Sequence, residues 1–417
     1  MQNRSINKHT IFIGMINVAS QLNDLAYGFT QNGHKCVSAV SKYHTNMITS
    51  KTVDYDLSDD WISKLIGKIR FGRIRAFFYK RFPHIKDRVF KKVLKKCDVF
   101  IFIWRTFEDD CSDLEILKQL GKKVITIFVG DECRWKYAVE QEFNHYGLDY
   151  IGYENGYDEG TNGLDYRLLT LRTAEKHSDL ILNSKDGAQL ALRPYVHSLN
   201  FLRFSDYTLH YPDRIDPVVL HLPSNPSFKG TKHILTVFNK LEKEFPKTTF
   251  RHLENLSHDE ALLEYTNADI LVGQILCPGG GKQEREALAS GVTVLSNMDP
   301  RYVDAVHQNS PIIHVDKDSL ETQLRTFITN HDLRFKQSRL GFTYAKTTHD
   351  VERFCHDLIS YLNCSKSANY TFPNYFRNLF TPEESHISVY NRWNNYVSKC
   401  NWYKSHVQNG SRDGLVF

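Results

Sequence analysis

Short apolar runs alternate with longer amphipathic stretches along the whole chain. Apolar runs bounded by polar or glycine residues are typical of buried parallel strands, and helical spacing between them is typical of crossover helices. The first half contains five predicted strands, near 10–14, 35–41, 98–104, 122–129 and 179–183. The second half contains five more, near 217–222, 248–254, 269–275, 292–296 and 311–315. The sequence therefore predicts an α/β protein with two Rossmann-like, doubly wound sheets.

Helix boundaries are also readable in places. A helix over Leu22–Asn32 is expected to end at Gly33, and one over Thr231–Glu244 carries its apolar residues on a single stripe. Ser257 and Glu260 have the spacing of a capping box, which predicts a helix that starts there.

The length of 417 residues suits two or three separate cores. The segment 200–217 is polar and contains Pro212 and Pro217, so we interpret it as a hinge between the halves. The predicted organisation is an N-terminal domain over 1–205, a C-terminal domain over 206–365, and an aromatic and helical extension over 366–417 with a helix near 385–405.

Composition excludes several classes of protein. Hydrophobic residues make up 41% and charged residues 24%, which excludes a disordered or collagen-like chain. The eight cysteines form no CxxC pair, which argues against a zinc ribbon or a disulfide framework and favours reduced thiols in the cytoplasm. The longest apolar runs, VFIFIW and VITIFV, are far too short to span a bilayer, and the first residues do not resemble a secretory signal.

Positive charge is concentrated in one segment. Between Trp61 and Cys97, thirteen Lys and Arg face a single acid, Asp87, so this segment carries +12 and the rest of the chain −7. Because apolar residues are interleaved with the basic ones over 63–96, one hypothesis is an interfacial helix pair that docks peripherally on an anionic membrane at its inner face. The alternative is a solvated helical face over an ordinary core. Nucleic acid is disfavoured, since no recognised motif accompanies the charges.

Three motifs follow predicted strands of the second half, where open α/β sheets bind ligands. In the first, Ser224 and Asn225 precede Lys229 and Gly230 at a helix start, an arrangement that suits a diphosphate. The alternative for Lys229 is an ordinary surface lysine.

In the second motif, the loop Glu254, Asn255 and Leu256 lies at the end of a strand and could hold a nucleobase edge through its backbone. An ordinary connection between strand and helix is the competing interpretation.

The third motif is CPGGGKQEREALASGVTVLSN, from Cys277 to Asn297. Gly279, Gly280 and Gly281 allow the backbone to approach a ligand closely, and the helix that follows carries Glu284 and Glu286. A carboxylate there can accept both hydroxyl hydrogen bonds of a ribose. The alternative is that these glutamates only complement the helix dipole.

HLPSNPSFKGT, ADILVGQ and EALASGVTVLSN together resemble the donor-binding domain of GT-B fold glycosyltransferases of the family 4-like group, whose usual forms are HAPS(N)xxxKGT, ADIVVDQ and EAMAxGxPV. The resemblance implies that Glu286 binds the nucleotide ribose, that Lys229 neutralises the diphosphate, and that Gly279, Gly280 and Gly281 face the donor sugar. Three positions depart from the pattern: Pro278 replaces the first glutamate of the family's pair, Gly273 an aspartate and Thr293 a proline.

The first half resembles the family's acceptor domain more faintly. The opening IGMINVASQLND places Gly14, Asn17 and Ser20 in the loop on the acceptor side, and VITIFVGDECRW places Gly130, Asp131 and Arg134 there. In an inverting reaction Asp131 or Glu132 is the candidate base, whereas a retaining reaction relies on support for the departing diphosphate. The alternative is that Asp131 and Arg134 only order their loop. Asp54-Tyr55-Asp56 has DxD spacing but follows no strong strand, so we predict no metal site.

The expected function is a metal-independent, hexosyltransferase-type enzyme of polysaccharide biosynthesis. It would move a sugar from a nucleotide-diphosphate donor, with no other cofactor, to a hydroxyl of a glycan or lipid-linked glycan. Two alternatives remain open. One is a GT-B fold sugar-nucleotide epimerase, and the other, motivated by Pro278, is an inactive nucleotide- or glycan-binding homologue.

Overall fold

The computed structural model describes residues 8–43, 53–57, 65, 68, 74, 77, 84–130, 132–134, 136–148, 161–197, 201–303, 307, 309–363 and 370–371. The chain divides into two compact units. The N-terminal unit takes residues 1–138, 158–198 and 355–417, and the C-terminal unit takes 139–157 and 199–354. The division after 198 differs from the predicted boundary after 205, and the described residues of the predicted extension, Tyr370 and Thr371, pair with a strand of the N-terminal unit.

The N-terminal unit is built on a sheet whose strands, within the described residues, run in the order β14-β8-β7-β6-β5-β1-β2-β4, with β3 paired to β1. All of the pairings are parallel except that of β14 with β8. The strands are β1 (Thr10–Asn17), β2 (Lys35–Val40), β3 (Lys42–Tyr43), β4 (Tyr55–Asp56), β5 (Val99–Ile103), β6 (Lys123–Ile127), β7 (Leu180–Asn183), β8 (Tyr195–His197) and β14 (Tyr370–Thr371).

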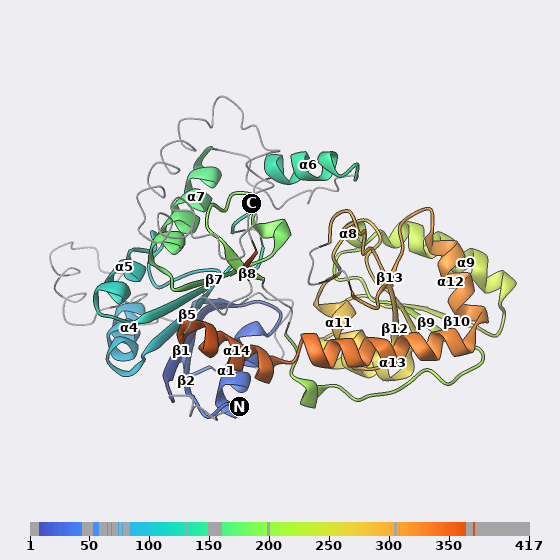
Figure 1. The fold of residues 1–417 in the computed structure, drawn as a ribbon, viewed down its shortest axis with the longest axis horizontal. Coiled ribbons are helices and arrows are strands. Elements are labelled where there is room, and N and C mark those ends of the chain that lie inside the picture. Colours follow the sequence, from blue (N-terminus) through green and yellow to red (C-terminus); the bar gives the residue numbers. More distant parts are fainter. Residues whose placement is uncertain are drawn as a thin grey trace. The chain divides into compact units, whose positions relative to one another are not determined.

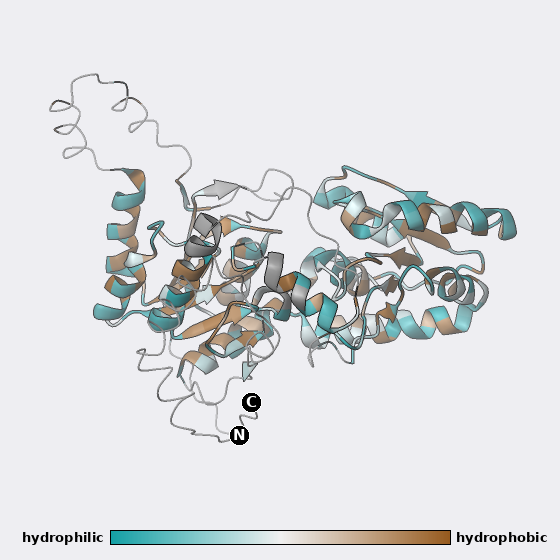
Figure 2. Cartoon of the chain, turned by 90° about the horizontal axis from the view of Figure 1, so that it is seen from above, coloured by the Kyte–Doolittle hydropathy of each residue, from teal (hydrophilic) through white to brown (hydrophobic). Residues whose placement is uncertain are grey.

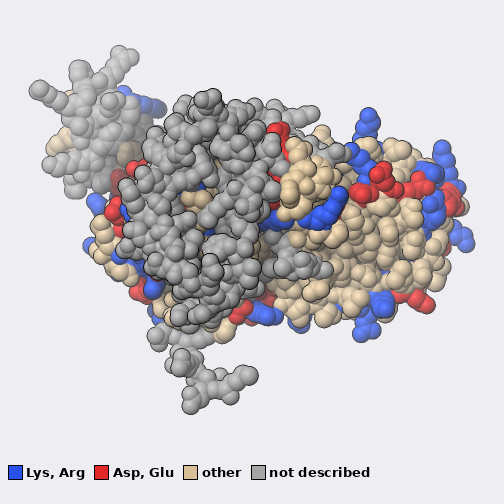
Figure 3. All heavy atoms as spheres, turned by 45° about the horizontal axis from the view of Figure 1, so that its top comes forward, with Lys and Arg blue, Asp and Glu red and all other residues tan. Residues whose placement is uncertain are grey.

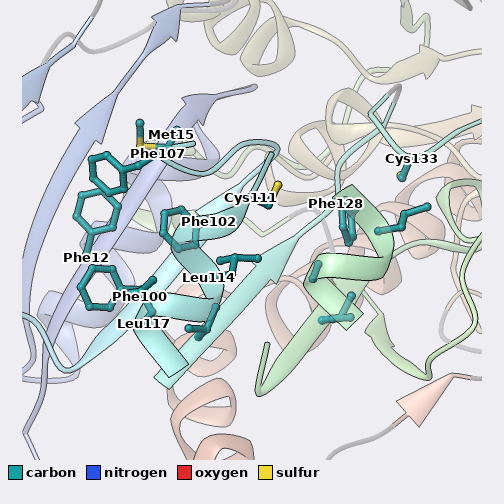
Figure 4. Packing of buried hydrophobic residues seen from close by; sticks show 14 of the residues in the cluster. Phe12, Met15, Phe100, Phe102, Phe107, Cys111, Leu114, Leu117, Phe128 and Cys133 are labelled. Carbon is teal, nitrogen blue, oxygen red and sulfur yellow. The ribbon is translucent and has the colours of Figure 1, made fainter. Parts of the chain in front are cut away.

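One face of this sheet is covered by helices whose apolar stripes meet aromatic strand residues. Phe12 of β1 stacks among Phe100 and Phe102 of β5 and Phe107, with ring centroids 5.1–5.9 Å apart, as Figure 4 shows. Leu114 and other apolar side chains of the helices close the same cluster. The helices of this cluster are α4 (Ile85–Lys96), α5 (Ser112–Gln119) and α7 (Thr161–His177). The N-terminal unit also has α1 (Gln21–Gln31), most of α14 (Val351–Asn363), which contacts α1, and a short 3-10 turn, η1, at Lys185–Gly187.

The C-terminal unit has a five-stranded, all-parallel sheet in the described residues, in the order β10-β9-β11-β12-β13. Its strands are β9 (Val218–His221), β10 (Thr249–His252), β11 (Ile270–Val272), β12 (Thr293–Ser296) and β13 (Ile313–His314). Its helices are α6 (Lys136–His145), α8 (Pro226–Lys229), α9 (Thr231–Glu244), α10 (His258–Asn267), α11 (Lys282–Ala289), α12 (Leu320–Thr329) and α13 (His331–Thr348), with a 3-10 turn, η2, at Phe204–Asp206.

Strand residues alternate between the two faces of this second sheet. Leu220, Leu271 and Val294 pack toward α10, α11 and α13, whereas their neighbours Val219 and Ile270 pack toward α9 and α12. Figure 1 shows α9 and α12 on one side of the strands and α11 and α13 on the other. Figure 2 shows the apolar strands between helices that turn hydrophilic surfaces outward. The structure thus confirms the two Rossmann-like sheets that the apolar runs predict.

The segment 201–217 is not a free connection. Leu202 is fully buried and its backbone bonds His349 and Val351, and the carbonyl of His210 lies where a Cβ on Gly291 would be. The segment therefore packs on the C-terminal unit, which corrects the prediction of a hinge throughout 200–217.

Two of the charged motifs have structural explanations. Asp54 of the DxD sequence accepts hydrogen bonds from the Ser38 backbone and hydroxyl at 2.7 and 3.0 Å, beside the pairing of β2 with β4. In α4, Val89 and Val93 are buried in the core, so in this helix the apolar residues serve the fold. The predicted helix at 385–405 and most of the basic segment before residue 84 lie outside the described residues.

Figure 3 shows charges of both signs interspersed on the described surface.

Candidate functional site

The C-terminal sheet has a topological switch point between β9 and β11. From β9 the chain moves to β10 on one side, and it then returns to place β11 on the other side of β9. Loops leave the carboxyl ends of β9 and β11 in opposite directions, and ligands bind at such a point in open α/β sheets. Lys229 follows β9, and the three glycines with α11 follow β11. The predicted donor motifs therefore flank this switch point.

The loop after β9 and the short helix α8 bury the side chain of Lys229. Ser224 and Asn225 are exposed, and the Asn225 side chain caps the short helix α8 by accepting from the Phe228 N–H at 3.1 Å. Gly230 follows in a left-handed conformation with φ 81°, and a Cβ there would lie 2.6 Å from Ile275 Cγ1. Only glycine fits, because both the backbone angle and the space exclude a side chain. Lys229 is left 6% exposed.

Lys229 is joined to the first turn of α11. Its ammonium donates a hydrogen bond to Gln283 Oε1, and Gln283 Nε2 donates to the Leu222 carbonyl at 2.6 Å. Gln283 and Glu286 are three residues apart on α11, which places them on one helix face about 4.5 Å apart along the axis. Lys229 is thus bonded to the first turn of α11, and Glu286 lies about one turn further along that helix.

His221 ties the loops around the switch point together. Its Nδ1 lies 2.8 Å from the Val272 carbonyl, so this nitrogen carries the proton, and Nε2 then accepts from the Thr231 hydroxyl at 2.9 Å. Burial lowers the pKa of His221 to about 4. This histidine is therefore a neutral crosslink between β9, β11 and the start of α9.

Arg285 holds the glycine loop. Its guanidinium is buried and donates to the carbonyls of Gly279 and Gly281, at 2.7 and 3.1 Å. Gly279 and Gly280 have φ 104° and 59°, and a Cβ on Gly280 would meet Arg285 Nη1 at 2.4 Å. Arg285 was not identified from the sequence. It stands among the charged residues of KQERE, and nothing in that pattern predicts that its side chain bonds the preceding glycine loop.

Glu284 is a structural carboxylate. It is fully buried and accepts from the backbone N–H groups of Gly281 and Gln274 at 2.6 and 3.2 Å and from the Ser296 hydroxyl at 3.2 Å. Burial opposes its ionisation, but Lys229, Arg285 and the Gly281 N–H more than offset burial, so its pKa is lowered. This carboxylate also accounts for Gly273, because a Cβ on Gly273 would lie 2.4 Å from Glu284 Oε1.

Glu286 has different partners. It is 5% exposed, and its Oε1 lies 2.8 Å from His258 Nε2 and 3.3 Å from the Tyr207 hydroxyl. Tyr265 is buried nearby, and burial followed by the charges of Glu286 and Glu284 raises its pKa well above the usual value. Neither His258 nor Tyr207 was identified from the sequence, since they lie 28 and 79 residues from Glu286.

The loop after β10 contributes less. Glu254 is exposed and lies 2.9 Å from His252 Nε2, Asn255 has a left-handed φ of 58°, and Leu256 packs against the core. These contacts favour the interpretation of an ordinary connection that positions α10, whose first residue is His258.

In the N-terminal unit the predicted acceptor-side residues are spread over several elements. Gly14 lies within β1, paired to Phe102, and not in a loop, because the apolar run continues to Asn17. Asn17 is the last strand residue and accepts from the Leu22 N–H at 3.2 Å, and Ser20 precedes α1 with φ 62°. The loop after β1 thus begins later than predicted.

The loop after β6 carries the other candidates. Asp131 lies outside the described residues. Glu132 is buried, and its Oε1 accepts from the Val129 N–H at 2.5 Å. Arg134 approaches Gly130, where an added Cβ would lie 3.3 Å from Nη1. These contacts show Glu132 and Arg134 engaged within the loop.

The described residues contain no candidate metal cluster and no candidate membrane span. No group of three or more His, Cys, Asp or Glu side chains is placed to hold a metal ion there. No helix in the described part of the chain has the length and apolar character needed to cross a membrane.

The two Rossmann-like units define the fold class, which is that of the GT-B glycosyltransferases. Sucrose-phosphate synthase from Thermosynechococcus elongatus matches with a TM-score of 0.55 and 10% identity, over 87% of this chain and all of that one. An alpha-glucosyltransferase solved with UDP and a 13-mer DNA matches with a TM-score of 0.54 and 11% identity, over 85% of this chain and all of that one.

Anabaena HepE, solved with UDP and glucose, matches with a TM-score of 0.52 and 10% identity, over 85% of this chain and 99% of its own. No family model and no curated protein matches the sequence.

Proposed function

We propose that this protein is a glycosyltransferase that moves a sugar from a nucleotide-diphosphate donor to a hydroxyl of a glycan or glycolipid acceptor. One observation carries the proposal. The buried ammonium of Lys229, at the end of α8, is bonded to Gln283 of α11, and Glu286 lies about one turn further along α11 at the same switch point of the sheet. A diphosphate needs a cationic partner and a ribose needs a hydrogen-bond acceptor, and Lys229 and Glu286 supply these two kinds of group.

The chemistry of transfer fits these residues. As the bond between the sugar and the diphosphate breaks, negative charge grows on the diphosphate oxygens. Lys229 and the N–H groups at the starts of α9 and α11 would stabilise that charge. A lysine with helix dipoles can do the work of a metal ion, so the proposed reaction needs no metal. The solved structures with UDP and glucose, and with UDP and DNA, support a nucleotide-sugar donor.

Substitution of the two donor residues tests this proposal. Lys229→Ala and Glu286→Ala should each weaken binding of UDP, GDP or ADP, whichever binds, by about tenfold or more, since each removes a charge-assisted contact. Isothermal titration measures the affinities. Lys232→Ala removes an exposed lysine of α9 and is the matched control. Normal affinity in Glu286→Ala would show that the donor site is placed wrongly.

The same protein separates the three candidate activities. Incubation with UDP-, GDP-, CMP- and ADP-sugars should give slow donor hydrolysis, or transfer when an acceptor is present. Interconversion of the sugars without an acceptor would instead support an epimerase. Binding without any turnover would support an inactive homologue, the alternative that Pro278 raises by replacing the first family glutamate.

On the acceptor side we propose Asp131 rather than Glu132 as the base of an inverting reaction. Glu132 Oε1 is already engaged by the Val129 N–H, which suits a residue that orders the loop. Asp131→Asn should therefore abolish transfer while donor affinity is kept, and Glu132→Gln should lower thermal stability. If Asp131→Asn retains full transfer activity, a retaining reaction without this base is the better mechanism.

We further propose that α4 attaches the enzyme to an anionic membrane, where a lipid-linked acceptor would be presented. Its apolar residues Val89 and Val93 are used by the core, while Arg88, Lys91, Lys92, Lys95 and Lys96 are exposed. Attachment through this helix would therefore be electrostatic, worth about 1 kcal/mol per basic residue and screened by salt.

Vesicle flotation tests this attachment. The protein should float with vesicles that contain phosphatidylserine, and replacement of the four exposed lysines of α4 (Lys91, Lys92, Lys95 and Lys96) by glutamine should reduce the floated fraction. The control replaces four exposed lysines of the C-terminal unit, Lys232, Lys243, Lys247 and Lys336. Equal flotation with neutral and anionic vesicles would contradict the proposal.

A further inference from the structure

We infer that His258 and Tyr207 are positioning residues that make Glu286 selective for a ribonucleotide over its 2′-deoxy form. The inference rests on the proposed function, because it concerns how the proposed donor site recognises the ribose. It starts from an asymmetry between the two oxygens of one carboxylate.

Oε1 of Glu286 is occupied within the protein. His258 Nε2 lies 2.8 Å away and the Tyr207 hydroxyl 3.3 Å away. An ionised carboxylate only accepts hydrogen bonds, so both partners donate, and each carboxylate oxygen accepts about two bonds. The two donors therefore fill Oε1.

Oε2 of the same carboxylate is different. It has no hydrogen-bond partner among the described residues, although Glu286 is nearly buried, and it is not sealed from solvent. Oε2 is therefore accessible to a ligand, whose hydroxyls can replace the solvent that would otherwise bind this oxygen. Two lone pairs remain on Oε2, and the 2′ and 3′ hydroxyls of a ribose supply two adjacent O–H donors.

The two positioning residues come from separate elements, which fixes the orientation of the carboxylate. His258 is the first residue of α10, held in place by the capping box of Ser257 and Glu260. Tyr207 follows η2 in the segment that packs on the C-terminal unit. Neighbouring Glu284 is saturated by backbone and hydroxyl donors, so it does not compete for these partners. With Oε1 anchored on two sides, Oε2 is the oxygen presented to a ligand.

The consequence is specificity at the sugar of the nucleotide. If the Glu286 carboxylate could rotate, either of its oxygens could accept a hydrogen bond from the 3′ hydroxyl of a 2′-deoxy nucleotide. Loss of the 2′ hydroxyl would then cost little binding free energy. With Oε1 filled, that loss removes one of two charge-assisted bonds to a fixed acceptor. The unaltered protein should then bind UDP about tenfold or more tightly than 2′-deoxy-UDP.

Titration of the full chain with UDP and 2′-deoxy-UDP, repeated with GDP and ADP against their 2′-deoxy forms, measures this ratio. His258→Leu should bring the ratio close to one, and Tyr207→Phe, which removes one of the two donors, should lower it partly. His258→Gln keeps an N–H donor and should retain most of the selectivity. His233→Leu, on the exposed side of α9, is the matched control.

The ratio separates positioning from loss of structure, because a variant that is merely destabilised loses affinity for both forms together. An unchanged ratio in His258→Leu overturns the inference while the proposed function stands. If the unaltered protein binds none of these nucleotides, the proposed function fails and the inference with it.

Discussion

At the scale of single residues, two buried charged groups define the proposed donor site, the Lys229 ammonium and the Glu286 carboxylate. Lys229 and Glu286 belong to motifs that follow strands, so their edge of the sheet could be inferred from spacing alone. Arg285, His258 and Tyr207 act through contacts made only when distant segments meet. Contacts between distant segments leave no signal in the pattern of apolar and polar residues. Gly14 was misplaced for the opposite reason, since a long apolar run hides where the strand ends.

The pairing of Gly273 with Glu284 gives a prediction at this scale. Gly273→Ala should destabilise the C-terminal unit by about 1–3 kcal/mol, because the new methyl group occupies the position of Glu284 Oε1. In a Glu284→Ala background the same substitution should cost less, since the nearest atoms are then removed and only the Ser296 hydroxyl, 2.9 Å from the new methyl group, remains. A double-mutant cycle by chemical unfolding measures the coupling, and strict additivity would contradict the stated contact.

At the scale of elements, the ten predicted strands are all present because apolar runs bounded by polar residues are local signals. The short strands β3, β4, β8 and β14, of two or three residues each, were not predicted, since so few residues show no pattern. The start of α10 was also predicted, and its capping box is present in the structure. The sequence did not predict the side-chain hydrogen bonds that join the elements around the switch point. Neutral His221 makes two of them, between β9 and β11 and between β9 and α9.

His221 predicts a dependence of stability on pH. Its pKa is about 4 in the folded protein, against about 6.5 for an ordinary histidine, because burial disfavours the charged ring. The unfolded chain therefore takes up the proton first, and the stabilisation present above pH 6.5 is lost as the pH falls toward 4. The free energy of unfolding of the C-terminal unit should decline across this window.

The comparison with His221→Gln isolates this contribution. Other groups act in the opposite direction, such as Asp113 in the N-terminal unit, whose pKa burial raises to about 6 and which favours folding in acid. The variant should be less stable at pH 7 and should lose part of the decline between pH 6.5 and 4. An identical slope in both proteins would rule out His221 as its source.

At the scale of the whole molecule, the sequence predicted two α/β units, and the structure confirms them. The chain path through them was not predicted: α14 begins at Val351 beside Leu202, and from Cys355 onward it belongs to the N-terminal unit, where Cys355 Sγ lies 3.7 Å from the Leu25 carbonyl. A change of partner inside one continuous amphipathic helix leaves no mark on its periodicity.

Separate cores predict separable unfolding. Leu114→Ala in the N-terminal unit and Leu241→Ala in the C-terminal unit each remove a buried side chain and should cost about 2–5 kcal/mol. In calorimetry each should lower a different transition, and a saturating nucleotide should raise only the transition that Leu241→Ala lowers. A single transition that both substitutions shift equally would contradict this expectation.

The antiparallel pairing of β14 with β8 has a consequence for synthesis on the ribosome. The N-terminal sheet acquires its last strand only when Tyr370 and Thr371 emerge, after the whole of 199–354 has been translated. The nascent protein must therefore keep the β8 edge uncovered while the later unit is being made, and that unit is free to fold first.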